Sequence, residues 1–195
     1  FDKTVVILNI GSMIDLGFSV SLKNDIALLI PWQGGMESGN AAADVIFGKS
    51  EPSGRLTDTA AVSYAAYPSS DNFGNRDETV YAEDIFVGYR YFETFDRKSV
   101  LFPFGAGIGY GEFERETLSF QKDGSKVSAL IKTKNIGKYP GKDVIEIYAD
   151  LPAGKLSKPK RVLADFKKSS LIAPGCEETL GFEFDIYTLA SYDDG

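Results

Sequence analysis

The sequence contains no histidine among its 195 residues. A Ser-His-Asp triad, a Cys-His dyad, a histidine-ligated zinc and an imidazole general base are therefore excluded within this chain. Any chemistry that the chain carries out by itself would have to use carboxylates, lysines, tyrosines or backbone amides.

Cysteine, positive charge and long apolar runs are also scarce. Cys176 is the single cysteine, so an internal disulfide and any metal motif with two cysteines are excluded. The 28 acidic residues outnumber the 21 basic ones, and a net charge of −7 argues against a nucleic-acid partner. Basic residues do crowd residues 155–168, which we interpret as a solvated strand edge. No apolar run approaches the roughly 20 residues of a membrane helix, so no membrane partner is expected.

The chain does have an ordinary globular composition, with 43% hydrophobic residues, 20 Gly, 14 Phe and 10 Tyr. Its length suits one large domain or two small ones. The pattern of apolar, aromatic and turn residues along the chain predicts three parts: residues 1–60 as α/β, 61–112 as a connecting segment, and 113–195 as a β-sandwich. Because the first residue is Phe1 rather than Met and an apolar run already opens at Thr4, we expect this to be a piece of a longer chain.

Residues 1–60 alternate strand and helix patterns. The β-branched run 4–10 and the apolar run 26–30 predict two strands, the first buried on both faces. Residues 14–24 weakly suggest a short helix, and residues 40–47 a second helix that ends at Gly48. This order favours parallel pairing, with ligands expected at the carboxyl ends of the strands.

The rest of the chain is rich first in aromatic residues and then in strands. Residues 61–112 predict an ordered segment rather than a flexible linker, with one strand or short helix in 80–92. Residues 113–195 show alternating apolar positions separated by Gly and Pro turns, which is typical of an immunoglobulin or fibronectin III-like sandwich. We count about six strands, where such folds normally have seven.

Three local patterns suggest chemistry but have simpler interpretations. The glycine-rich loop 34–39 has the layout of a phosphate cradle, but Asn40 stands where a P-loop needs lysine, so we interpret it as a tight turn. Residues 71–78 are dense in oxygen ligands, yet Arg76 intrudes and the EF-hand spacing is absent; no metal is expected there. Cys176 has no histidine to activate it as a nucleophile, so we interpret it as an incidental residue of the turn that begins at Pro174-Gly175.

A string of motifs in fixed order is more informative. Residues 31–48 read P-W-Q-G-G-M-E-S-G-N-A-A-A-D-V-I-F-G, 51–56 read E-P-S-G-R-L, 83–92 read E-D-I-F-V-G-Y-R-Y-F, and 101–110 read L-F-P-F-G-A-G-I-G-Y. Together with N-I-G at 135–137, G-K-D-V-I at 141–145 and A-S-Y-D-D at 190–194, they resemble glycoside hydrolase family 3. The departures are Ser38 for a usual Gly, Glu51 for Asn and Gly109 for Ser.

The resemblance implies the second half of the family's α/β domain followed by its fibronectin III-like domain. It also implies a parent enzyme that hydrolyses terminal β-linked sugars with retention, acting on oligosaccharides or aryl glycosides. Retention needs two carboxyl groups roughly 5–5.5 Å apart. In the family the nucleophilic Asp lies in a (β/α)8 barrel and the Glu acid/base lies upstream of the strand at 4–10, so no catalytic residue is expected here. We reject Asp71 and Glu93 as mimics of these motifs. No cofactor is implied.

The expected partners are therefore the barrel and the N-terminal part of the α/β domain of the same parent protein. The loops 9–12 and 32–37 should face the barrel. Trp32 could pack on a sugar or on the barrel, and packing on the barrel is favoured; Arg90 and Glu83 could form a buried pair that organises the segment. The residues expected near the substrate are Trp32, Gln33, Glu37, Glu83 and Arg90.

Two further expectations concern the sandwich. The family normally adds one more strand after residues 191–194, so a strand edge should be unpaired, and a homodimer could form through it. The alternative function is a carbohydrate-binding or adhesion module. It would need exposed aromatic residues in a row, and Tyr139, Tyr148 and Tyr187 are not obviously so arranged. A nucleotide-binding α/β protein is a third hypothesis.

Overall fold

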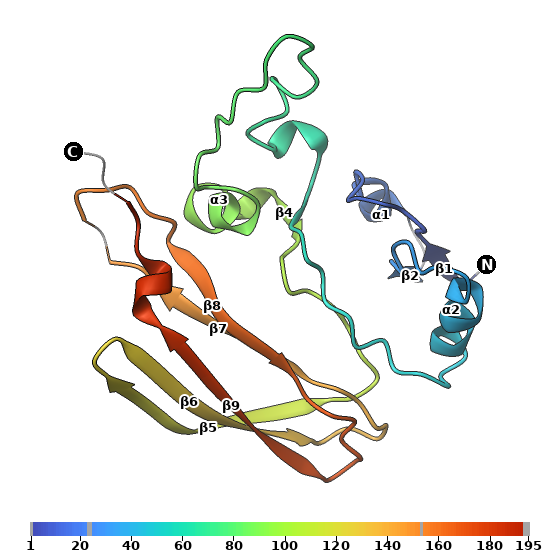
Figure 1. The fold of residues 1–195 in the computed structure, drawn as a ribbon. Helices are drawn as coiled ribbons and strands as arrows, with labels where there is room; N and C mark the ends of the chain where they lie inside the picture. The colour runs from blue at the N-terminus through green and yellow to red at the C-terminus, as the bar shows by residue number, and fades with distance from the viewer. Residues whose placement is uncertain (1, 23–24, 153, 193–195) are drawn as a thin grey trace. The chain divides into compact units, whose positions relative to one another are not determined.

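The computed structural model describes residues 2–22, 25–152 and 154–192. Two compact units divide the chain (Figure 1): Phe1–Ser50 with Leu56–Ala106 form unit 1, and Glu51–Arg55 with Gly107–Gly195 form unit 2. The short segment Glu51–Arg55 thus belongs to the second unit although it interrupts the first. The three-part division expected from the sequence stays a prediction.

Unit 1 begins with the expected parallel pair. Strand β1 (Lys3–Ile7) pairs in parallel with β2 (Asp25–Leu29), and the four-residue helix α1 (Phe18–Ser21) lies between them in sequence. Helix α2 (Ser38–Ile46) follows β2 and contains the alanine-rich stretch that predicted it. Gly48 follows the helix with a φ of 73°, the left-handed conformation that ends many helices at glycine.

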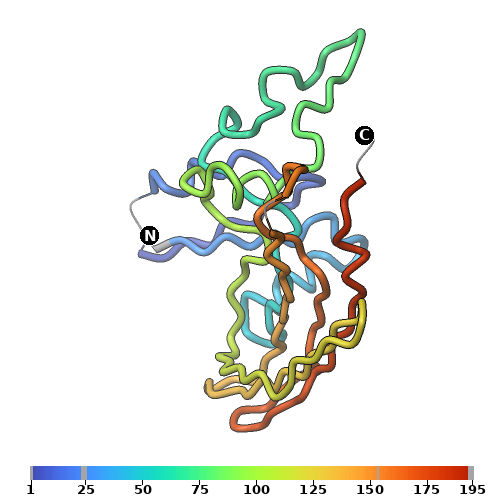
Figure 2. Tube along the Cα trace, turned by 90° about the vertical axis from the view of Figure 1, so that its left-hand side faces the viewer, coloured from blue at the N-terminus to red at the C-terminus, as the bar shows by residue number. Residues whose placement is uncertain are grey.

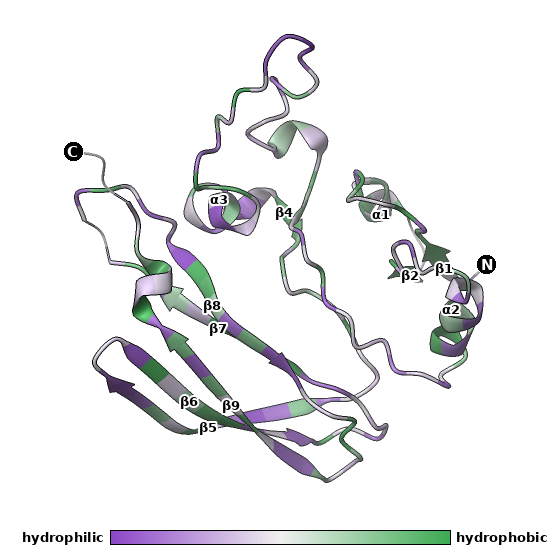
Figure 3. Cartoon of the chain, viewed as in Figure 1, coloured by the Kyte–Doolittle hydropathy of each residue, from purple (hydrophilic) through white to green (hydrophobic). Residues whose placement is uncertain are grey.

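The burial predicted for β1 is wrong for this chain. The strand is largely exposed, with 47% of Val5 and 49% of Ile7 accessible to solvent, although both strands are apolar (Figure 3). Within the described residues β1 pairs with one strand, β2, and no second strand lies beside it. Apolar runs of this kind normally occur in sheets whose two faces are covered.

The aromatic-rich segment forms the remainder of unit 1. Its elements are β3 (Ala60–Ala61), η1 (Tyr64–Ala66), α3 (Tyr89–Thr94), η2 (Arg97–Ser99) and β4 (Val100–Phe102), with β3 antiparallel to β4. Phe92 on α3 is 1% exposed and contacts the Tyr67 and Tyr91 rings edge-on, at centroid distances of 5.6 and 5.3 Å. Of the strand or short helix expected within 80–92, the structure has a helix, which begins at Tyr89 and continues to Thr94, and aromatic packing orders this segment.

Unit 2 is a sandwich of two antiparallel sheets. The first sheet has the order β5-β6-β9, and the second pairs β7 with β8. The strands are β5 (Phe113–Asp123), β6 (Lys126–Asn135), β7 (Val144–Asp150), β8 (Arg161–Lys168) and β9 (Glu177–Asp185), followed by η3 (Ile186–Leu189). Figure 2 traces the yellow-green β5–β6 hairpin and the red β9, which pairs with β6.

The core of the sandwich follows the alternation seen in the sequence. Alternate positions of β6 point inward, which gives β6 the striped hydropathy of Figure 3. The buried cluster consists of Ala129, Ile131, Ile145, Leu180 and Phe182, with Ile147 packed against it. The alternation of apolar positions predicted for residues 113–195 is thus observed in β6, because a strand places successive side chains on opposite faces.

The described part of the sandwich has five strands and one isolated bridge, between Gly141 and Ile172. Two charged side chains of β8 form hydrogen bonds with the backbone of β9. Asp165 accepts a hydrogen bond from the Glu183 amide at 3.3 Å, and Lys167 donates one to the Gly181 carbonyl. A missing last strand remains a prediction. In the same described residues, no helix is long and apolar enough to cross a membrane.

Candidate functional site

The loops that follow β1 and β2 leave the same edge of the parallel pair, because parallel strands end together. The Leu8 amide still bonds to the Leu29 carbonyl at 2.9 Å, and the loops then lie against each other. A Cβ added at Gly11 would stand 3.1 Å from the side-chain nitrogen of Gln33. The structure thus brings Gln33 beside the first loop, as parallel pairing predicts.

The second loop has an unusual backbone at Trp32. Its φ of 55° lies in the left-handed region, which a bulky residue rarely adopts. Trp32 is half-buried, whereas Gln33 and Glu37 are exposed. Glu37 accepts a hydrogen bond at 2.5 Å from the Asn40 side-chain amide in the first turn of α2, so this carboxylate is held locally. The loop therefore presents exposed polar groups beside one constrained aromatic side chain.

Glu83 and Arg90 lie near α3, and the expected pair between them is absent from the ion pairs of the described residues. Arg90 instead lies over the Tyr89 ring, with its Cζ 6.0 Å from the ring centroid. Its Nε is buried and has no hydrogen-bond partner among the described residues. The hydrogen bonds and ion pairs of these residues connect neither Glu83 nor Arg90 with the Trp32–Glu37 loop.

Asp71 and Glu93, the two acidic residues rejected as catalytic, lie in a turn and beside an arginine, respectively. Asp71 lies exposed in the turn after Ser70, whose amide bonds to the Tyr67 carbonyl at 3.0 Å. Glu93 lies one helical turn before Arg97, with 3.8 Å between its carboxylate and the guanidinium Nε. Within the described ranges, no group of three or more acidic or cysteine side chains could hold a metal ion. This includes the oxygen-rich loop 71–78.

The sandwich contains a buried charged network that sequence analysis missed. Asp143 is fully buried and accepts two hydrogen bonds from the Arg115 guanidinium, at 2.8 and 2.6 Å, and one from the Thr133 hydroxyl at 2.8 Å. The Asp143 amide donates to the Ser169 hydroxyl at 2.8 Å. The signal that could have found it is the alternation of β6, which places Thr133 on the inward face with Ile131 and Ala129.

Opposing effects set the pKa of Asp143. Burial raises the pKa, but hydrogen bonds from Arg115 and Thr133, with the positive charges of Arg115 and Arg55, outweigh it and hold the pKa below the ordinary aspartate value. The hydrogen bond from Arg115 to Asp143 raises the pKa of the guanidinium. Both groups are therefore charged at neutral pH, and the network joins four regions: β5, β6, the residue before β7 and the residue after β8.

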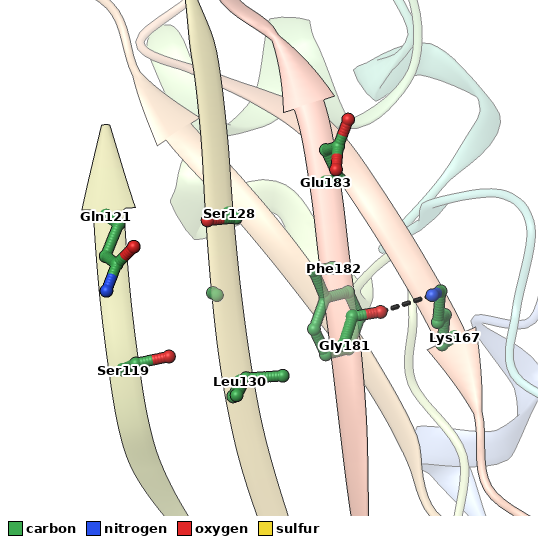
Figure 4. A pocket seen from close by; sticks show the side chains of 9 residues that line it. Ser119, Gln121, Ser128, Leu130, Lys167, Gly181, Phe182 and Glu183 are labelled. Carbon is green, nitrogen blue, oxygen red and sulfur yellow. Dashed lines mark hydrogen bonds between the residues drawn. The ribbon is translucent and has the colours of Figure 1, made fainter. Parts of the chain in front are cut away.

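The outer face of the β5-β6-β9 sheet carries a shallow groove of about 490 Å³ (Figure 4). Its lining includes Ser119, Gln121, Ser128, Leu130, Gly181, Glu183 and Lys167. The Lys167 side chain reaches over the edge of β9 to the Gly181 carbonyl. The one aromatic residue of the lining, Phe182, is 3% exposed and points its ring into the core, so the groove has no aromatic platform for a sugar ring.

Comparison with known proteins gives a consistent family. Residues 1–110 match the glycosyl hydrolase family 3 C-terminal domain, and residues 143–195 match a fibronectin type III-like domain. The chain is 46% identical over 194 residues to a beta-glucosidase of Ruminococcus albus, covering 100% of this chain and 20% of that protein. Beta-glucosidase A of Butyrivibrio fibrisolvens is 37% identical over 212 residues, with 100% and 26% covered.

Solved structures agree with this similarity. A beta-glucosidase from Paenibacillus barengoltzii superposes with a TM-score of 0.95 at 39% identity, over 100% of this chain and 22% of that one. Beta-glucosidase 3B from Thermotoga neapolitana gives a TM-score of 0.89 at 36% identity, over 97% and 27% of the two chains. The chain thus spans about a quarter of its relatives' length. Since the family model matches more than half of its residues, the chain belongs to glycosyl hydrolase family 3.

Proposed function

We propose that this chain is a non-catalytic portion of a retaining β-glucosidase-like enzyme that cleaves terminal β-linked sugars. The observation that carries the proposal is the similarity to beta-glucosidases along the full length of the chain, which accounts for only 20% and 26% of two such relatives. The rest of the parent protein, including a barrel domain and the first part of the α/β domain, would supply the catalytic carboxylates.

The role proposed for this chain is to support the active site from the carboxyl edge of the β1–β2 pair. Trp32, Gln33 and Glu37 are the residues nearest to this role, because their loop extends from the strand ends where ligands of parallel sheets bind. Trp32 in particular has the backbone strain that occurs at functional sites. Glu83 and Arg90 are proposed to lie at the margin of the same region, Arg90 through its unpartnered Nε.

The test compares variants of the parent polypeptide with an aryl β-glucoside as the substrate. Trp32→Ala should lower kcat/KM by about tenfold or more, since one lost positioning contact costs on the order of 1.4 kcal/mol in the transition state. Phe47→Ala is the matched control, because Phe47 is 80% exposed at the other end of α2. Equal kcat/KM values for the two variants would contradict the supporting role of Trp32.

The alternative of a carbohydrate-binding module is less well supported. Tyr139 and Tyr187 are exposed, but they follow the carboxyl ends of β6 and β9. Because these strands are antiparallel, they finish at opposite ends of the sheet. A row of aromatic residues between them is therefore not expected. Titration of the chain with cello-oligosaccharides should give no saturable signal, and a saturable change in tyrosine fluorescence would favour the module.

A second hypothesis about partners is a homodimer that forms through an unpaired strand edge. Asp165 and Lys167 already form hydrogen bonds with the backbone of β9, whereas among the described residues β7 pairs only with β8. Because β5 and β8 also pair with a single strand among the described residues, a second copy could add at β5, β7 or β8. Sedimentation of the chain over a range of concentrations tests this hypothesis, since a concentration-dependent dimer would support edge pairing and a monomer at every concentration would refute it.

A further inference from the structure

Glu51 holds one end of the segment Glu51–Arg55 against the sandwich. One carboxylate oxygen, Oε2, accepts a hydrogen bond of 2.6 Å from the Lys142 amide, which lies 91 residues away in sequence. The other oxygen, Oε1, is buried and has no hydrogen-bond partner among the described residues. A buried carboxylate oxygen without a donor is costly, so its position requires a reason.

The position of Oε1 coincides with the space that a side chain at residue 109 would fill. A Cβ added at Gly109 would stand 2.4 Å from Oε1, which is closer than real Cβ atoms come to any neighbour. The next atoms are Cδ of Glu51 at 3.4 Å and the Pro52 carbonyl at 3.6 Å, so the carboxylate alone closes this space. Gly109 has no positive φ, and its backbone therefore does not require glycine.

Glu51 and Gly109, the two residues of this contact, are also two of the three departures from the family 3 motifs that the sequence resembles, which have asparagine and serine at these places. Compared with those motifs, the side chain at 51 is longer by a methylene group and the one at 109 lacks a hydroxymethyl group. Because interiors are close-packed, neighbouring changes that conserve volume are tolerated better than either change alone.

We propose that Glu51 and Gly109 form a pair of matched side-chain sizes, and that this pair fixes the segment Glu51–Arg55 to the sandwich. The longer glutamate places Oε2 on the Lys142 amide, and the absent side chain at 109 makes room for Oε1. One further hydrogen bond attaches the same segment, from the Lys168 ammonium to the Ser53 hydroxyl at 3.4 Å. The backbone of Gly107 also lies so close to the segment that an added Cβ would stand 2.7 Å from the Gly54 carbonyl. The side chain that position 109 accepts therefore depends on the side chain at position 51, and the reverse also holds.

A double-mutant cycle on the chain tests the proposal by thermal unfolding. Gly109→Ser alone should lower Tm by about 3–10 °C, because its side chain must displace the buried carboxylate. Glu51→Asn alone should also lower Tm, since it leaves a gap. The double variant should return to within about 3 °C of the parent, because the shorter amide and the serine refill the space.

Two controls separate this pairing from a general effect. Gly54→Ser adds the same side chain to the same segment where nothing lies within 4 Å, and it should change Tm by less than about 2 °C. Glu51→Gln keeps the length of glutamate, so Gly109→Ser in that background should remain destabilising.

Amide exchange at Lys142 provides a local readout that does not depend on global unfolding. Exchange should accelerate about tenfold in Gly109→Ser, the equivalent of losing one hydrogen bond, and it should stay fast in the double variant, because asparagine is too short to reach the Lys142 amide. Additive effects of the two substitutions on Tm would overturn the proposal, as would unchanged Lys142 exchange in Gly109→Ser. So would equal rescue of Gly109→Ser by Glu51→Gln and by Glu51→Asn.

Discussion

Replacing Asp143 by asparagine should destabilise the sandwich far more than an ordinary surface change. The carboxylate is fully buried and accepts three hydrogen bonds, two of them from the Arg115 guanidinium. Asparagine removes the charge and turns one acceptor into a donor that faces other donors. Hydrogen bonds to charged groups contribute about 1.5–3 kcal/mol each, but the Arg115 side chain is 50% exposed and regains water, so we expect a net loss of about 2–4 kcal/mol.

The assay is urea unfolding of the chain monitored by far-UV circular dichroism, with free energies taken by linear extrapolation. Asp150→Asn is the matched control, because Asp150 also pairs with an arginine on an adjacent strand but is 67% exposed. That exposed pair should contribute no more than about 1 kcal/mol. If Asp143→Asn costs no more than Asp150→Asn, the Asp143 network does not stabilise the sandwich as argued.

The same network fixes the sign of a pH effect. Folding holds the pKa of Asp143 below its ordinary value, so the folded state binds this proton less readily than the unfolded state does. The contribution is therefore complete above the ordinary aspartate pKa and is lost as pH falls through the lowered one. Unfolding free energies of the parent and of Asp143→Asn should converge on acidification below about pH 4. A constant difference down to pH 2 would contradict this linkage.

Three other substitutions test separate parts of the fold. Phe92→Ala should cost about 3–5 kcal/mol in urea unfolding, because it empties the aromatic core of unit 1, whereas Phe73→Ala, at 80% exposure, should cost less than about 0.5 kcal/mol. Gly48→Ala should lower stability by about 1 kcal/mol because its φ is 73°, while Gly39→Ala within α2 should raise it; the same sign for both would contradict the backbone argument. Lys167→Met should speed amide exchange along β9 and promote aggregation, and an unchanged aggregation rate would show that Lys167 does not protect that edge.

Sequence periodicity predicted the elements whose pattern lies within a short run of consecutive residues. The alternation of β6 identified its inward face, and the alanine-rich stretch with Gly48 identified α2 and its end. The same reasoning failed for the burial of β1, because continuous apolar residues indicate a covered strand but not which part of a protein covers it.

The site depends on contacts between distant segments, which periodicity does not encode. The motifs located the Trp32 loop and the position of Arg90, but not the left-handed backbone of Trp32 or the unpartnered Nε of Arg90. The bond from Lys142 to Glu51 joins residues 91 positions apart, and that of Arg115 to Asp143 joins residues 28 apart. Polar pairs of this kind become visible only when the fold brings their strands and loops together.

The most direct test of the central claim measures aryl β-glucoside hydrolysis by the 195-residue chain alone and by the parent polypeptide. We predict turnover by the parent and none by the chain, because the chain is expected to hold neither catalytic carboxyl group. Glu93 is half-buried beside Arg97 and is the closest mimic of an acid/base motif. Hydrolysis by the isolated chain that disappears in its Glu93→Gln variant would contradict the account.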